Sequence, residues 1–103
     1  MIRVSVMYPN ESDQFDMDYY LNKHIPLVHQ LLDSFGLVRT EVDKGIGTAE
    51  PGAPAPYAVI AHLVFESIEE MGKGLGAHDP ELAADVPNFT DIKPQFQISE
   101  IIK

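Results

Sequence analysis

The segment from Tyr57 to Glu66, YAVIAHLVFE, is the most apolar part of the chain and limits its fold more than any other feature. Its β-branched and apolar residues predict a strand. Neighbouring side chains of a strand point to opposite faces, and here both sets are largely apolar, with His62 as the polar exception. We therefore expect both faces of the sheet around this strand to be covered.

The remaining strands and helices are predicted from short-range patterns. Two further runs rich in β-branched or alternating apolar residues, 2–9 and 95–103, read as strands, and 37–46 reads as a more polar one. A helix is expected over 17–35. A capping box of Ser67 and Glu70 predicts the start of a second helix, which the glycines at 72, 74 and 76 should keep short or irregular. Asp79 and Pro80 then suit the start of one or two further turns.

This order of elements, β-α-β-β-α-β, is that of the ferredoxin-like α+β fold, with a four-stranded antiparallel sheet. We expect one such domain over residues 1–103. Two helices cover only one face of that sheet, and no part of the chain is left to cover the other. A second copy of the chain is therefore expected to pack its sheet against this one, as a homodimer.

The predicted helix 17–35 has recognisable ends. Asp16 suits the N-cap, and Phe15 before it can pack on Tyr20. Gly36 suits the left-handed residue that follows a helix. Pro26 falls on the polar side, where its missing N–H leaves a carbonyl facing water, and it should bend the helix just beyond His24.

His24 is the one ionisable residue near the middle of the inward arc of this helix. At about 100° per residue, that arc contains Met17, Tyr20, Leu21, His24, Ile25, Leu27, Val28, Leu31, Leu32 and Phe35. Two roles are open to His24. It can be a core residue bonded to Tyr20 or to a strand carbonyl, or it can line a pocket between helix and sheet and act as a general acid or base.

Other polar residues are weaker candidates. His78 is a second candidate for catalysis, although a surface position beside a helix start is the simpler reading. His62 lies within the central strand, and its face cannot be assigned from the sequence. Tyr8 and Tyr20 each offer a ring for packing and a hydroxyl for a substrate oxygen. Asp85 and Asp91 read as turn-forming carboxylates.

Composition excludes several classes of function. The chain has no cysteine, so disulfides, thiolate catalysis and Cys-ligated metals are excluded. Seven Lys and Arg against 16 Asp and Glu give a formal charge of −9, which argues against binding nucleic acid or an anionic membrane. Signal-peptide, membrane-spanning and nucleotide-binding patterns are absent, so we expect a cytoplasmic protein without metal or cofactor.

Two stretches carry a family resemblance. FDMDYYLNKHIPLV at 15–28 and DVPNFTDIKP at 85–94 resemble the EthD-like proteins, which are associated with ethyl tert-butyl ether degradation. The resemblance covers essentially the whole chain. It implies a dimeric α/β barrel, in which two ferredoxin-like subunits press their sheets together, with a pocket between the helices and the sheet of each subunit. His24 matches the family's histidine, and Asp85, Asn88 and Phe89 match its later loop.

Three hypotheses for function follow. The first is a cofactor-independent enzyme, an isomerase, cyclase or monooxygenase, acting on a small hydrophobic ring or carbonyl compound. The second is a protein that binds a hydrophobic metabolite without chemistry, and the third is an interaction module. For the enzyme we expect catalysis by His24, Tyr20 and His78, and substrate contacts from Tyr8, Leu27, Phe89 and His62.

Overall fold

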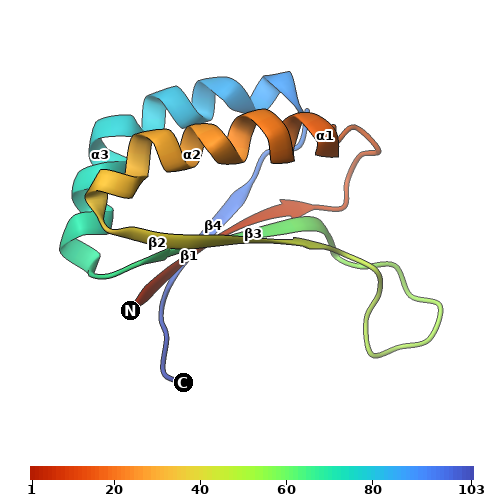
Figure 1. Cartoon of the computed structure of the whole chain (residues 1–103). Helices are drawn as coiled ribbons and strands as arrows, with labels where there is room; N and C mark the ends of the chain where they lie inside the picture. Colours follow the sequence, from red (N-terminus) through yellow and green to blue (C-terminus); the bar gives the residue numbers. More distant parts are fainter.

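The computed structural model describes all residues from Met1 to Lys103 and contains four strands and one layer of helical segments (Figure 1). The helical segments include π-helical and 3-10 turns, labelled η. In chain order the elements are β1 (Ile2–Pro9), α1 (Met17–Tyr19), η1 (Tyr20–His24), α2 (Ile25–Leu32), η2 (Asp33–Phe35), β2 (Leu37–Lys44), β3 (Tyr57–Phe65), α3 (Ile68–Asp85), η3 (Val86–Asn88) and β4 (Gln95–Glu100).

The sheet confirms the predicted ferredoxin-like α+β architecture. Its strand order is β2-β3-β1-β4, and each neighbouring pair is antiparallel. All the helical segments lie on one face of the sheet (Figure 1). The β2–β3 loop and the C-terminal end extend on the opposite side (Figure 1). No helix is both long enough and apolar enough to cross a membrane.

The first helical segment begins and ends as predicted. The Asp16 side chain accepts a hydrogen bond of 3.0 Å from the backbone N–H of Tyr19, which caps the helix. The Phe15 ring packs edge-on against Tyr20 at 5.1 Å between centroids. Gly36 has a φ of 80°, so the chain leaves the helix through the left-handed conformation that glycine adopts without strain.

Pro26 has a stronger local effect than a simple bend. The five residues before α2, Tyr20–His24, form a π-helical turn in which the N–H of Ile25 bonds the carbonyl of Tyr20. Because Pro26 has no backbone N–H to donate, the α-helical hydrogen-bond pattern is interrupted at this point, and the wider π-helical turn is tolerated. The regular spacing assumed from the sequence is therefore wrong here, and Leu21, expected on the inward arc, is 46% exposed.

The second helix differs from the sequence prediction. It is a single 18-residue α-helix in which the glycines at 72, 74 and 76 and Pro80 are all internal. Gly74 is buried where α3 meets the first helical segment, and a Cβ there would lie 2.8 Å from the Cβ of Phe35. This glycine therefore permits close helix packing. Ser67 caps the helix as predicted, accepting a bond from the N–H of Glu70.

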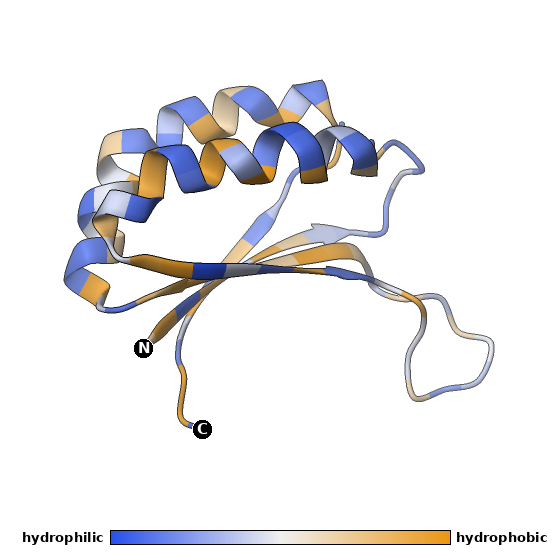
Figure 2. Cartoon of the chain, viewed as in Figure 1, coloured by the Kyte–Doolittle hydropathy of each residue, from blue (hydrophilic) through white to orange (hydrophobic).

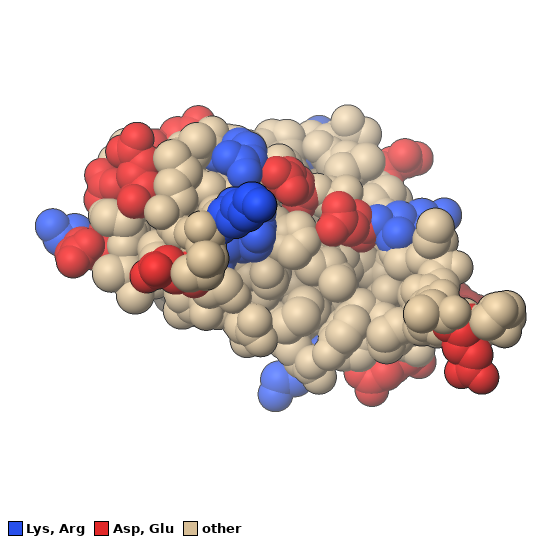
Figure 3. Space-filling model, turned by 90° about the horizontal axis from the view of Figure 1, so that it is seen from below, with Lys and Arg blue, Asp and Glu red and all other residues tan.

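The two faces of the sheet have different surroundings. The helices turn their apolar sides toward the sheet (Figure 2). On this inner face Val59, Ala61 and Phe65 of β3 are almost fully buried. The outer face carries Ile60 and His62, which are half-buried, and it is not covered by any element of this chain. Seen directly, that face is mostly uncharged, with scattered side chains of both signs (Figure 3).

Candidate functional site

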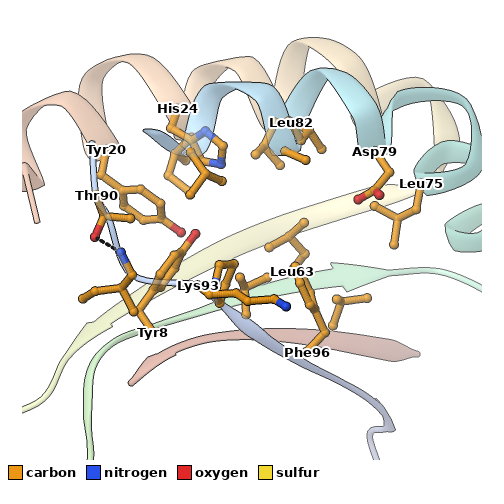
Figure 4. A pocket seen from close by; sticks show the side chains of 18 of the residues that line it. Tyr8, Tyr20, His24, Leu63, Leu75, Asp79, Leu82, Thr90, Lys93 and Phe96 are labelled. Carbon is orange, nitrogen blue, oxygen red and sulfur yellow. Dashed lines mark hydrogen bonds between the residues drawn. The ribbon is translucent and has the colours of Figure 1, made fainter. Parts of the chain in front are cut away.

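A cavity of about 970 Å³ lies between the helical layer and the inner face of the sheet. Its walls come from β1, η1, α2, α3, β3, β4 and the loop before β4, and 14 of its 23 lining residues are hydrophobic. Figure 4 shows the side chains that project into it. This volume is at the upper end of the range for cavities that bind small molecules.

The cavity opens along β4. The register with β1 pairs Phe96 with Val6 and Ile98 with Val4, so these side chains share the helix-facing side of the sheet. Both nevertheless remain exposed, at 62% and 54%, because the helices do not extend over this edge strand. An apolar compound can therefore reach the inner face of the sheet past Phe96 and Ile98.

His24 is held in the wall of this cavity by two aromatic rings. It is 6% exposed and lines the cavity. Its imidazole stacks on the Tyr20 ring at 5.3 Å with an interplanar angle of 18°, and Phe89 lies 4.7 Å away on a tilted plane. Tyr20 and His24 are the first and last residues of the π turn, so the wide turn and Pro26 contribute to this stacking.

The Nδ1 atom of His24 lies 2.9 Å from Oδ2 of Asp85, the last residue of α3. The other carboxylate oxygen of Asp85 accepts bonds from the Tyr19 hydroxyl at 2.7 Å and from the Asn88 amide at 2.9 Å. Burial raises the pKa of Asp85, but the hydrogen bonds from Tyr19, Asn88 and His24 outweigh it and hold this pKa below its ordinary value of 3.8. Asp85 is therefore ionised at neutral pH.

The ionised carboxylate decides which nitrogen of the His24 ring carries a proton. A carboxylate only accepts hydrogen bonds, so Nδ1 of His24 must donate to it. In the neutral ring, Nε2 is then the unprotonated nitrogen, with a lone pair available to accept a proton. No protein atom is bonded to Nε2, and the ring projects toward the cavity (Figure 4). The arrangement is that of a general base oriented by a carboxylate.

Two tyrosine hydroxyl groups complete this end of the cavity. The Tyr8 and Tyr20 side chains are buried and their hydroxyl oxygens point toward one another (Figure 4). Burial raises the pKa of Tyr8 to about 12 and that of Tyr20 further. Both phenols therefore stay protonated at neutral pH. Because the two hydroxyl groups are bonded to one another, the pair has one O–H left to donate to a ligand oxygen.

The structure brings some of the predicted site residues together and separates others. Tyr8, Tyr20 and His24 meet at one end of the cavity. Phe89 packs behind the His24 ring without lining the cavity. Leu27 packs against the core elsewhere.

The other two predicted histidines lie away from the cavity. His78 bonds Glu81 at 2.8 Å on the outside of α3 and packs edge-on against Phe35. His62 lies on the outer face of the sheet, where its two nitrogens lie 3.0 Å from Ser5 Oγ and 3.1 Å from Asp43 Oδ2. These neighbours fully occupy both nitrogens of the His62 ring.

Sequence reasoning missed the partners of His24. The sequence predicts Asp85 to be a turn-forming residue, whereas in the structure it is the carboxylate bonded to His24. Tyr19 is not among the residues expected on the inward arc of the helix, yet its hydroxyl reaches Asp85 across 66 positions of sequence. The signal that pointed to this site was the paired resemblance of 15–28 and 85–94, the two stretches that the fold brings into contact.

The cluster does not have the composition of a metal centre. No three His, Asp or Glu side chains converge on a common point anywhere in the chain. Only His24 and Asp85 meet here, and they are bonded directly to one another. Their geometry suits proton transfer through a hydrogen bond.

Replacing Asp85 by Asn tests the charge state assigned to this network. A depressed pKa means that the carboxylate stabilises the fold above pH 3.8 and that this contribution is lost as the pH falls through the folded-state pKa. We expect D85N to lower the free energy of unfolding by about 1–3 kcal/mol at neutral pH, the scale of lost hydrogen bonds to a charge. The difference from the wild type should shrink at about pH 2.5.

Denaturant titrations of both proteins at the two pH values measure this effect. D79N is the control, because Asp79 is exposed on the same helix and has no hydrogen-bond partner. A D85N defect of equal size at both pH values would show that the carboxylate's charge is not what stabilises the network.

Comparisons with known proteins agree with this geometry. A family model, the EthD domain, matches residues 8–93. A protein of Rhodococcus erythropolis, an uncharacterised 11.0 kDa product of the thcB–thcC intergenic region, is 34% identical over 91 residues, which cover 86% of this chain and 84% of that protein.

Solved structures show the same fold. An EthD-like protein from Ralstonia eutropha JMP134 is 34% identical with a TM-score of 0.90, and the match covers 99% of this chain and 92% of that one. An EthD family protein from Bacillus halodurans C-125 shares the fold at 18% identity and a TM-score of 0.79, with 99% of both chains covered. The chain therefore belongs to the EthD family.

Proposed function

We propose that this chain is an enzyme that moves a proton at the carbon next to a carbonyl group in a small, mostly apolar ring or carbonyl compound. The observation that carries the proposal is the position of His24: it lines a large apolar cavity and is bonded by its far nitrogen to an ionised carboxylate. A histidine held in this way is suited to general acid–base catalysis near neutral pH.

Each step of such a reaction has a group to perform it. Nε2 of His24 removes a proton from the carbon, and the electron pair of the C–H bond moves toward the carbonyl, which becomes an enolate. The hydroxyl pair of Tyr8 and Tyr20 donates a hydrogen bond to its oxygen. Asp85 stabilises the positive charge gained by the His24 ring. Return of the proton to a different atom gives an isomer and restores the enzyme.

The wall chemistry supports a hydrophobic substrate. Most residues around the cavity are apolar, among them Val4, Leu63 and Leu82. As a variant of the same chemistry, an electron-rich enolate held there can react with dissolved O₂ as the oxidant: a C–O bond forms at the carbon next to the carbonyl, and a proton completes the hydroperoxide. A candidate monooxygenase from Shewanella loihica shares the fold, at 10% identity and a TM-score of 0.64.

A protein that binds a hydrophobic metabolite without changing it is the second candidate. The feature that favours it is the wide opening past Phe96 and Ile98, which leaves a bound compound partly in contact with water. In that case His24 and the two tyrosines serve as hydrogen-bonding groups for a ligand oxygen.

Deuterium exchange separates the two candidates. The protein is incubated in D₂O with a panel of small cyclic ketones and lactones, and deuterium at the carbon next to the carbonyl is measured by mass spectrometry. We expect exchange above the buffer rate for at least one compound. His24→Gln should lower that rate by about 10²- to 10⁴-fold, the usual contribution of a general base.

His78→Gln is the matched control, because His78 is also bonded to a carboxylate but lies outside the cavity. The protein with His78→Gln should catalyse deuterium exchange of the compounds at the wild-type rate. If compounds bind, as seen by NMR shift changes, and yet the wild type never accelerates exchange, the enzymatic proposal is wrong and the binding role stands.

We further propose that the chain works as a homodimer in which the outer faces of two sheets pack together. This face lacks cover within the chain, and it holds the buried Nε of Arg3, which has no hydrogen-bond partner. Arg3 and Arg39 share the face with Glu41 and Asp43, so opposite charges can pair when a second copy is turned against the first.

Ile60→Glu tests the dimer, because Ile60 projects from β3 on the outer face. A buried charge there should shift the wild-type dimer to a monomer in light scattering coupled to size-exclusion chromatography. Ile68→Glu, at an exposed position in the first turn of α3, should stay dimeric. A wild type that is monomeric at all concentrations would contradict the proposal.

A further inference from the structure

Lys93 is the only lysine or arginine that lines the cavity. It lies in the loop before β4, and Figure 4 shows its side chain crossing the floor of the cavity, with the ammonium directed away from Tyr8 toward Phe96. Pro94 follows it and restricts its backbone to extended conformations. Ile92 before it is buried, so the base of the side chain is well positioned.

The charge of Lys93 is not neutralised in the structure. No carboxylate lies within ion-pair distance of its ammonium, and no hydrogen bond engages it. Arg39 is the only one of the seven Lys and Arg residues that forms an ion pair, so what distinguishes Lys93 is its place in the cavity wall. Lys93 is exposed at the open side of the cavity, beside the apolar Leu63 and Phe96 side chains, so an anionic group that enters from solution can reach its ammonium (Figure 4).

The two carboxylates that line the cavity, Asp79 and Asp91, form no ion pair with this cation. Asp79 projects from α3 beside Leu75, on the helical side of the cavity (Figure 4). Asp91 is exposed in the loop two residues before Lys93. A ligand with a single negative group thus has one favourable location for it, beside Lys93, and its apolar body can then extend along the cavity toward His24.

We infer that the natural ligand is an apolar compound with one carboxylate, and that Lys93 is the specificity-determining residue that binds this group. This inference rests on the proposed function, since it assigns a substrate class to the same cavity. Lys93 acts on binding and orientation, while the proton transfer belongs to His24.

A matched pair of probes tests the inference. 2-Naphthoate and 2-naphthalenemethanol have the same apolar body, but only the first carries a carboxylate at neutral pH. Their affinities for the wild type, K93M, K93R and K73M are measured by calorimetry. Lys73 is the control because it is exposed on α3 and does not line the cavity.

We expect the wild type and K73M to prefer the acid about tenfold, which corresponds to 1.4 kcal/mol. K93M should lose this preference while binding the alcohol unchanged, and K93R should keep it. If the wild type binds both probes equally, or K93M keeps the preference, the inference is wrong while the cavity remains a small-molecule site. If neither probe binds, both the inference and the proposed small-molecule site are overturned.

Discussion

The hydrogen bond between His24 and Asp85 is the interaction on which the candidate site depends. It joins the first helical segment to the C-terminal end of α3, across 61 positions of sequence. A carboxylate at the C-terminus of a helix is disfavoured by the helix dipole. Three donors, from Tyr19, Asn88 and His24, compensate for this cost and keep the carboxylate ionised. The same bonds fix the orientation of the imidazole at the cavity wall.

The cavity itself follows from the way two helices cover a four-stranded sheet. The helical layer does not extend over β4, so apolar side chains that face inward remain accessible along that edge. The π turn before Pro26 then places Tyr20 and His24 above the interior, close to Tyr8 of β1. The polar groups are therefore gathered at one end of an otherwise apolar space, an arrangement typical of sites that orient a hydrophobic substrate.

The sequence was sufficient for the fold and for the position of His24, and insufficient for its partners. Local sequence rules correctly predict strand β1, the helix N-caps at Asp16 and Ser67, and the end of the first helical segment at Gly36. The same rules do not predict that α3 is continuous, because tertiary packing at Gly74 outweighs the low helix propensity of glycine. The bonds of Asp85 and Tyr19 depend on contacts distant in sequence, and the π turn changes the helical spacing on which a wheel relies.

The protonation of the His24 ring tests the central claim most directly. A two-bond ¹H–¹⁵N correlation spectrum of labelled protein, at a pH where the ring is neutral, distinguishes its two tautomers. The account predicts a proton on Nδ1, donated to Asp85, and an unprotonated Nε2 directed at the cavity. A neutral ring with its proton on Nε2 would contradict the account, because that nitrogen could not then accept a proton from a substrate.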